Sequence, residues 1–293
     1  MQYFFIFPSL VFLLAMSACN PASLPNPTQP PTTTATLPPA NPPTATVPAV
    51  ATNTLTPTLT ATATPVPNGP CDNPLVPLGK GNRWVYRVTS SNGQAGFSLT
   101  SQGLQPGGNI TARVAYSDQN HDLTITEPVK CQDGAIVDFP LFVMNMLFSP
   151  YLDKYIPAAY VSGDYAPNYQ SLIQNNWVLN WQERYLTKEA FNLKDPRGLA
   201  GLSIPANTQM DVSFVLNNLH EAVVSPAGNF PQALKITQFL SLLVSGGVLN
   251  IGIGEWYEPY TGLVRAQINA VLLGNERLPI ESTLELMEFT PGN

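Results

Sequence analysis

The run from Val223 to Phe289 constrains the fold more strongly than any other part of the chain. It holds three stretches in which apolar and polar residues alternate, and turns that contain Pro, Gly or Asn separate them. Alternation with a period of two residues is typical of strands that bury one face, and short turns join strands that run antiparallel. The run therefore predicts an antiparallel meander.

The same pattern extends upstream. Trp84, Tyr86 and Val88 stand at alternate positions of a strand, and a hairpin signal follows at residues 91–93. Further strands are expected at residues 97–101, 110–117, 123–129 and 210–216. Residues 171–181 lead into another expected strand, which continues through residue 185. The segment from Phe139 to Phe148 is almost continuously apolar, so a buried strand and a buried helix remain alternatives there.

The expected fold class is therefore mainly β, with about nine to twelve strands. A sheet of that size must curl or close to protect its edges and to bury one face. We predict a curved antiparallel meander sheet, half-barrel or barrel-like, with a few short helices, and a disordered linker before it.

Charge divides the chain sharply. Residues 1–70 contain no Asp, Glu, Lys or Arg, so all 19 acidic and 13 basic residues, and the net charge of -6, belong to residues 71–293. Those residues suffice for one β-rich domain with a sizeable core. Mild acidity without a basic stripe argues against a nucleic-acid partner.

The N-terminus has the pattern of an export signal. Residues 4–16 are mostly apolar, too few to span a membrane comfortably, and Ser17-Ala18-Cys19 follows them. Small residues before a cysteine resemble the lipobox of bacterial lipoproteins, whose cysteine receives a diacylglyceryl group. This resemblance implies a signal peptide over residues 1–19, lipidation of Cys19 and a place on the extracytoplasmic face of the cell membrane. An ordinary cleaved secretory signal is the alternative, because residues 1–3 carry no Lys or Arg.

Residues 20–70 consist mostly of Pro, Thr and Ala and show no apolar periodicity. Such a composition cannot build a core and predicts a disordered linker. Frequent Pro favours extended polyproline II at ~3.1 Å per residue, so full extension reaches on the order of 150 Å. The segment is expected to serve as a spacer.

The cysteines predict a disulfide. If Cys19 is acylated, Cys71 and Cys131 remain as an even pair in an oxidising compartment. Neither belongs to a C-x-x-C motif, so a zinc site or a catalytic thiol is not expected.

Three motifs carry a family resemblance. They are the opening Pro77-Leu78-Gly79 with Trp84 and Tyr86, the segment Val223 to Ile236, and the segment Trp256 to Val264. Together they resemble uncharacterised exported lipoprotein domains of the TapB-like group, which are loosely similar to the LolA/LppX half-barrels. The resemblance implies a curved sheet, and the LolA/LppX likeness implies an apolar cavity. It supplies no catalytic residue.

Sequence motifs of catalysis are absent: the chain has no G-x-S-x-G, S-x-x-K or H-E-x-x-H. Asp118, Asn120 and Asp122 imitate the start of a calcium loop but lack its glycine. His121 in a turn and His220 near a strand start are expected at the surface. We therefore expect no cofactor and no metal site. The expected role is that of a non-enzymatic, membrane-anchored cell-surface lipoprotein that binds an apolar or glycan ligand or another envelope component. The alternative is an enzyme with a hydrolase-type site assembled from scattered residues such as His121, Asp122 and His220.

An aromatic middle segment is the candidate binding site. Tyr and Trp combine an apolar face with a polar group, which suits the mouth of a cavity or a sugar-stacking platform. The alternative is that the rings pack in the core. The candidate residues for an apolar or glycan ligand are Phe148, Tyr151, Tyr155, Tyr160, Tyr165, Trp177 and Trp181.

Overall fold

The computed structural model describes part of the chain: residues 71, 73–106, 110–117, 122–132, 134–136, 142–154, 156, 158–164, 180–194 and 201–292. The predicted signal peptide and linker, with Cys19, lie outside the described residues, as do Tyr155, Tyr165, Trp177, Asp118, Asn120 and His121. None of the helices within the described residues has the length and apolar composition that a membrane span requires.

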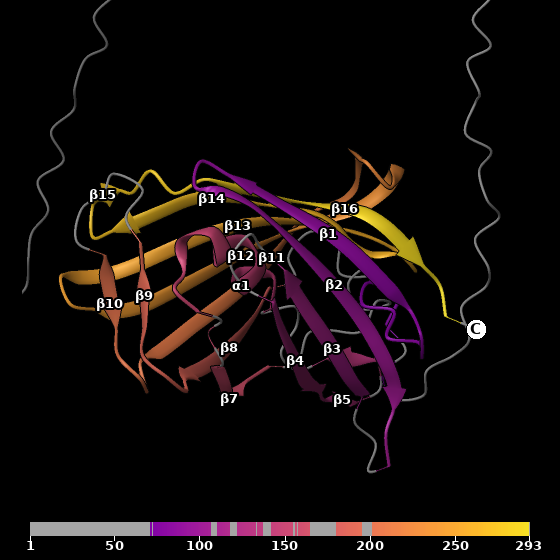
Figure 1. Ribbon diagram of the computed structural model, residues 1–293, viewed down its shortest axis with the longest axis horizontal. Coiled ribbons are helices and arrows are strands. Elements are labelled where there is room, and N and C mark those ends of the chain that lie inside the picture. The colour runs from indigo at the N-terminus through magenta and orange to yellow at the C-terminus, as the bar shows by residue number, and fades with distance from the viewer. Residues whose placement is uncertain are drawn as a thin grey trace, which may run out of the picture. The chain divides into compact units, whose positions relative to one another are not determined.

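One large antiparallel sheet dominates the described part (Figure 1). Its strand order is β4-β3-β2-β1-β16-β14-β13-β12-β11-β8-β7, with β15 paired to β14, which makes twelve described strands. The strands are β1 (Arg83–Ser90), β2 (Gly93–Leu104), β3 (Ile110–Ser117), β4 (Asp122–Val129), β7 (Ala158–Gly163), β8 (Asn180–Thr187), β11 (Gln209–Ser225), β12 (Gly228–Val244), β13 (Gly247–Glu258), β14 (Gly262–Leu273), β15 (Glu276–Arg277) and β16 (Ser282–Thr290).

Two short ribbons lie beside this sheet. They consist of β5 (Cys131–Gln132) with β6 (Ala135–Ile136), and β9 (Phe191–Leu193) with β10 (Leu202–Ile204). The prediction of a mainly β fold with a meander is confirmed, because β1 to β4 and β11 to β14 each pair in sequence order.

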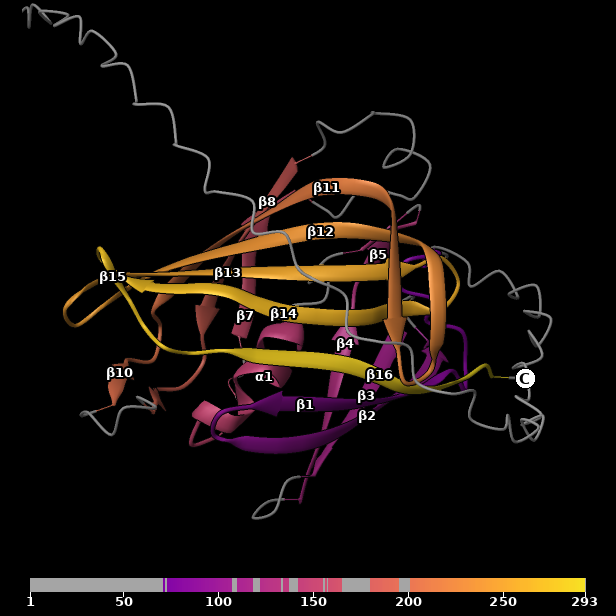
Figure 2. The same ribbon diagram turned by 90° about the horizontal axis from the view of Figure 1, so that it is seen from above.

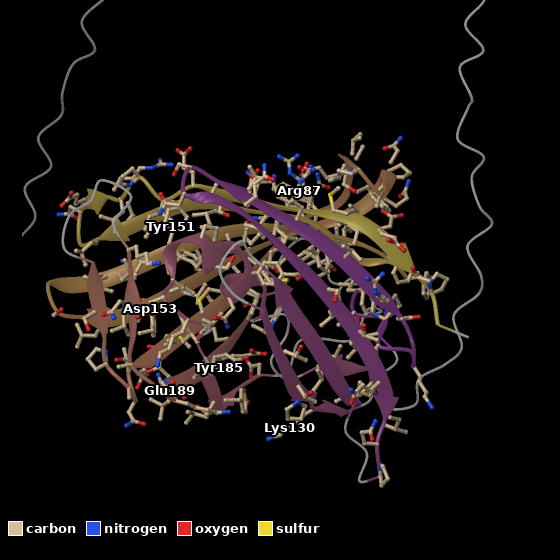
Figure 3. All side chains as sticks on the ribbon, viewed as in Figure 1. Arg87, Lys130, Tyr151, Asp153, Tyr185 and Glu189 are labelled. Carbon is tan, nitrogen blue, oxygen red and sulfur yellow. A yellow bond between two sulfur atoms is a disulfide. The ribbon has the colours of Figure 1, made fainter. Side chains whose placement is uncertain are left out.

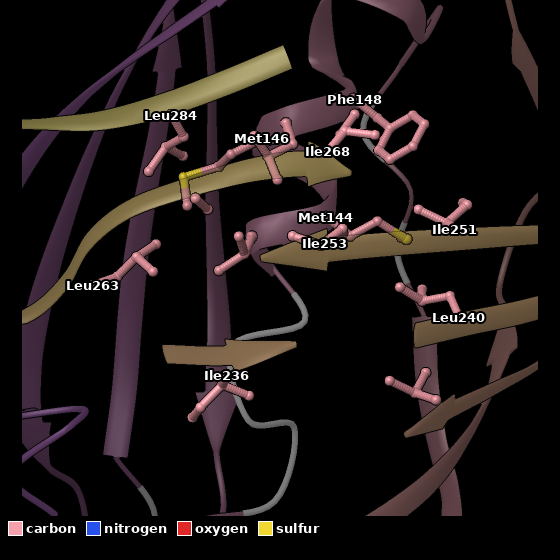
Figure 4. Packing of buried hydrophobic residues seen from close by; sticks show 14 of the residues in the cluster. Met144, Met146, Phe148, Ile236, Leu240, Ile251, Ile253, Leu263, Ile268 and Leu284 are labelled. Carbon is pink, nitrogen blue, oxygen red and sulfur yellow. The ribbon is translucent and has the colours of Figure 1, made fainter. Parts of the chain in front are cut away.

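The sheet curves over a short helix, α1 (Phe142–Phe148), which η2 (Ser149–Tyr151) extends. Met144 and Met146 of α1 lie against apolar side chains of the inner sheet face (Figure 4), and all of these side chains are buried. The sheet is not closed into a barrel: β4 and β7 stand at opposite ends of the strand order. Of the two alternatives for the apolar segment, the helix is the one formed over residues 142–148.

Two of the sequence motifs form one structural unit. Trp84 donates its indole N–H to the carbonyl of Thr261 at 2.5 Å, and the Tyr86 hydroxyl donates to the carbonyl of Leu263 at 3.1 Å. Gly262, with a φ of 91°, lies so close that an added Cβ would be 3.3 Å from Trp84 Nε1. The aromatic opening of the domain therefore fixes the β13–β14 turn.

Bulges bend the β11–β12 hairpin. The pairing register of β11 shifts three times between Leu216 and Val223, and bulges increase local twist and bend strands. Residues 218–234, which we name the arm, turn across β13 and β14 toward β16 (Figure 2). The backbone N–H of Ala227 donates to the carbonyl of Leu286 at 3.1 Å. His220 lies inside β11, and its predicted position near a strand start is wrong because β11 extends over seventeen residues.

The predicted disulfide is confirmed. Cys71 and Cys131 are bonded with a Cα–Cα distance of 5.0 Å. The bond joins the start of the described domain to β5.

Candidate functional site

A groove of about 760 Å³ lies on the outer face of the sheet, on the side opposite α1. This face is turned toward the viewer in Figure 2, where β7 and β8 run at a steep angle to β12 and β13. Adjacent strands of a sheet are rotated relative to one another, and the groove crosses several of these strands on the outer face. The described residues that line it from the outer face include Gln182, Arg184, Asp211, Ser213, Phe239, Ser241, Asn250, Gly252, Ala270 and Leu272.

Phe239 provides the aromatic surface of this groove. Its side chain points outward and is 49% exposed, whereas the neighbouring Gln238 and Leu240 are buried. The register places Phe239 beside Gly252, and Gly252 beside Ala270. A Cβ added to Gly252 would lie 3.9 Å from two carbons of the Phe239 ring. The ring therefore lies next to a floor of very small residues, which keeps the groove open beside it.

A row of outward polar residues, which we name the polar row, lies next to the row of residues that contains Phe239. The register aligns Asp211, Ser241 and Asn250 across three neighbouring strands. The guanidinium of Arg184 donates to Asp211 Oδ1 at 2.7 Å, and this hydrogen bond lowers the pKa of the Asp211 carboxyl. Because the two opposite charges are paired, the polar row has hydrogen-bonding groups but little net charge.

The arm is attached beside this groove through Trp256, which is 5% exposed. The Trp256 indole N–H donates to Glu221 Oε1 at 2.9 Å, and Lys235 Nζ donates to the same oxygen at 3.2 Å. Lys235 Nζ and the Arg265 guanidinium lie 4.8 and 5.5 Å from the centre of the Trp256 ring. Burial raises the pKa of Glu221, but the hydrogen bonds from Trp256 and Lys235 outweigh it and lower the pKa overall. Trp256 is thus occupied by internal contacts and holds the arm on the sheet.

Two glutamate–tyrosine pairs lie on the inner face. Glu255 with Tyr257 and Glu183 with Tyr185 each occupy positions i and i+2 of one strand, and both tyrosine hydroxyls donate to their glutamate. Glu255 is 0% exposed, and burial raises the pKa of its carboxyl to about 8. Sequence reasoning missed these pairs, although an E-x-Y spacing at inward strand positions was readable. Because they are buried, they contribute to the core rather than to an open site.

The residues predicted to bind ligand do not form one surface. Phe148, Tyr151 and Trp181 are buried among the core side chains. The Tyr151 hydroxyl donates to the carbonyl of Glu281 at 2.8 Å, and Trp181 stacks on Phe214 with ring centres 4.8 Å apart. Figure 3 marks Tyr151 and Tyr185 on the inner side of the sheet.

Among the described residues predicted to bind ligand, Tyr160 is the one that lies on an edge strand of the sheet. It is half-buried on β7 and packs edge-to-face with Tyr185, with the two ring centres 5.7 Å apart. The described residues bring none of the predicted aromatic side chains into the outer groove. Among the described residues, no group of three or more His, Cys, Asp or Glu could hold a metal ion, and His220 is exposed.

Comparison with known proteins yields only distant structural likenesses. No family model matches the chain, and no curated protein matches it. A "putative exported protein with YmcC-like fold" from Bacteroides fragilis is 16% identical with a TM-score of 0.45, covering 72% of this chain and 96% of that one. A "putative lipoprotein" from Parabacteroides distasonis is 19% identical with a TM-score of 0.48, covering 74% of this chain and 97% of that one. No function is transferred from either, and the likeness to TapB-like and LolA/LppX domains stays a prediction.

Proposed function

We propose that this chain is a lipid-anchored protein of the extracytoplasmic face whose β-rich domain binds a ligand without transforming it. The observation that carries the binding role is the outer groove of about 760 Å³. Its volume falls within the range of known ligand sites. Its walls come from strands of one continuous sheet, so its side chains are positioned before a ligand arrives.

The composition of the groove favours binding over catalysis. Its described lining residues supply hydroxyls, amides and an ion pair, and they include no histidine or cysteine. The Asp211 carboxylate is engaged by Arg184 and Gln209, so it is not poised as a general base.

The disulfide supports the location. Cys71 and Cys131 form a disulfide. Disulfides persist in oxidising compartments outside the cytoplasm. The lipobox-like Ser17-Ala18-Cys19 and the uncharged linker after it are consistent with an exported domain held at a distance from a membrane.

Cys19→Ala tests the anchor. Cells that express the native chain and are fed radiolabelled palmitate should label it, and the variant should carry no label and leave the membrane fraction. A native chain that sediments with membranes but incorporates no label would refute lipidation. Protease added to intact cells should degrade the domain, and protection of the domain from protease would refute its outward location.

Gly252→Val tests the binding role. Valine suits a strand, so the fold should be preserved, while its methyl groups fill the floor beside Phe239. Native mass spectrometry of the full chain isolated from its own membrane should show a ligand mass that the variant lacks. Leu243→Ala is the control, because Leu243 lies on β12 with Phe239, faces the same side of the sheet, is 72% exposed, and is outside the groove lining. Equal ligand masses on all three chains would refute binding at this groove.

A further inference from the structure

We infer that the outer groove binds an uncharged carbohydrate chain, with Phe239 as the platform on which a sugar ring stacks. This inference rests on the proposed function and names the class of ligand. It depends on three features of the groove: an open aromatic face, an aligned row of hydrogen-bonding groups, and cancelled charge.

The first feature is the accessible ring. Sugar rings present flat C–H faces, and these pack on the faces of aromatic side chains, whose electron density attracts the slightly positive hydrogens. Phe239 is half exposed in the middle of β12, and Gly252 and Ala270 leave space on the neighbouring strands. The fixed strand backbone limits the motion of the ring, so stacking costs little conformational entropy.

The second feature is the polar row. Sugar hydroxyls both donate and accept, and they pair best with side chains that offer both kinds of group. Ser241 supplies a hydroxyl and Asn250 an amide, directly next to each other in the register. Ser213 stands beside Phe239 on β11 and adds a second hydroxyl. A sugar stacked on the ring would therefore have its rim hydroxyls within reach of donors and acceptors on two sides.

The third feature is charge. Arg184 is the cation on the groove's outer lining, and Asp211 is its bonded partner at 2.7 Å. An acidic ligand would have to compete with Asp211 for the guanidinium, whereas a neutral sugar can accept from Arg184 and donate to Asp211 without breaking the pair.

The length of the groove favours a chain over a single sugar. Its lining extends from β8 through β11, β12 and β13 to β14. Neighbouring strands are ~4.8 Å apart, so the five strands span on the order of 20 Å. A short oligosaccharide laid across the strands would meet both the ring and the polar row.

Two other occupants fit less well. A lipid chain requires an enclosed apolar channel, and here an ion pair, three serines and an asparagine line an open groove. Proline-rich peptides, such as the chain's own residues 20–70, dock in grooves that several aromatic side chains line. Phe239 is the single aromatic residue in the described lining.

The test uses the full chain on an array of uncharged and acidic oligosaccharides. The best uncharged binder is then titrated by calorimetry against the native chain and three variants. Phe239→Ala and Gly252→Val should each weaken binding about tenfold or more, whereas Leu243→Ala should leave it within about twofold. Binding should change little between about 50 and 500 mM salt, because no net charge is neutralised. Circular dichroism of each variant checks that the fold is retained.

The outcomes separate the two proposals. Phosphatidylglycerol vesicles and a synthetic peptide of residues 20–70 are titrated in parallel. Binding of vesicles or peptide alone, lost on Phe239→Ala, would overturn the carbohydrate inference and leave the binding role intact. Carbohydrate binding that all three variants retain would place the sugar elsewhere and overturn the inference for this groove. If no probe binds the native chain, and if its native mass is also ligand-free, both proposals fail.

Discussion

Replacing Glu255 by glutamine should stabilise the domain at neutral pH and have little effect near pH 4. The Glu255 carboxyl is 0% exposed and accepts a hydrogen bond from Tyr257 at 2.7 Å. Its second oxygen, Oε1, has no hydrogen-bond partner among the residues that the structure describes. Burial therefore disfavours the ionised form and raises the pKa from 4.5 to about 8.

The sign of the effect follows from proton binding. Between about pH 4.5 and 8 the folded domain holds a proton on Glu255 that the unfolded chain releases, so stability falls as pH rises through this range. Each pH unit between those pKa values costs ~1.4 kcal/mol. The cost at pH 7 is therefore roughly 3 kcal/mol, and glutamine, which is neutral and of similar shape, avoids it.

The assay is urea unfolding of the native chain and of Glu255→Gln at pH 4, 6, 7 and 8. The difference in unfolding free energy between the two chains should grow from near zero at pH 4 to about 3 kcal/mol at pH 7. Glu221→Gln is a control of opposite sign. The pKa of Glu221 is lowered in the folded domain, so its stabilising contribution is present above its unfolded pKa and is lost as pH falls.

A difference between native chain and Glu255→Gln that is constant from pH 4 to pH 8 would refute the reasoning. It would mean that Glu255 titrates alike in the folded and unfolded chain. A larger difference at pH 4 than at pH 7 would show that the buried carboxyl is ionised and that an unrecognised donor compensates it.

Three further predictions concern stability. Cys131→Ser should lower the unfolding free energy by about 4 kcal/mol, since the bond closes a loop with a sequence separation of 60, and the native chain should lose the same amount on adding reductant. Trp256→Phe removes the hydrogen bond to Glu221 and should increase amide hydrogen exchange in the arm while exchange in β1 and β2 stays unchanged; unchanged arm exchange would contradict the attachment. Gly262→Ala should cost more in thermal unfolding than Gly274→Ala: both positions have positive φ, but an added Cβ meets Trp84 at Gly262 and nothing within 4 Å at Gly274.

Local pattern predicted the strands better than their arrangement. The alternation at Trp84, Tyr86 and Val88 reads directly as one buried face, and the structure buries all three. The apolar segment at residues 142–148 could not be assigned from periodicity, because every position suits a buried element of either kind. Pairing of Trp84 with Thr261 joins residues that are 177 positions apart, and nothing local encodes it.

The groove could not be predicted from the sequence for the same reason. It exists because β8 lies next to β11 and because Gly252 falls opposite Phe239. Both facts depend on sheet order and register, which a single sequence does not state. The aromatic middle segment drew attention because its rings are concentrated in sequence, yet the described rings of that segment pack mainly inward, and one isolated phenylalanine on β12 faces outward.

The position of β16 between β1 and β14 has a consequence for folding. Arg83 pairs with Thr290, so β1 lacks one of its two neighbours until the chain through residue 290 is available. Until then β1 to β4 form one sheet, and β7, β8 and β11 to β14 form another, so β1 and β14 are edge strands without β16 as their neighbour. Such pairing over a long sequence separation gives a high contact order, which slows folding and leaves those edges open to other chains. A chain that ends before Ser282 should therefore form two aggregation-prone half-sheets rather than a slightly smaller domain. The domain should become protease-resistant only after β16 has paired with β1 and β14.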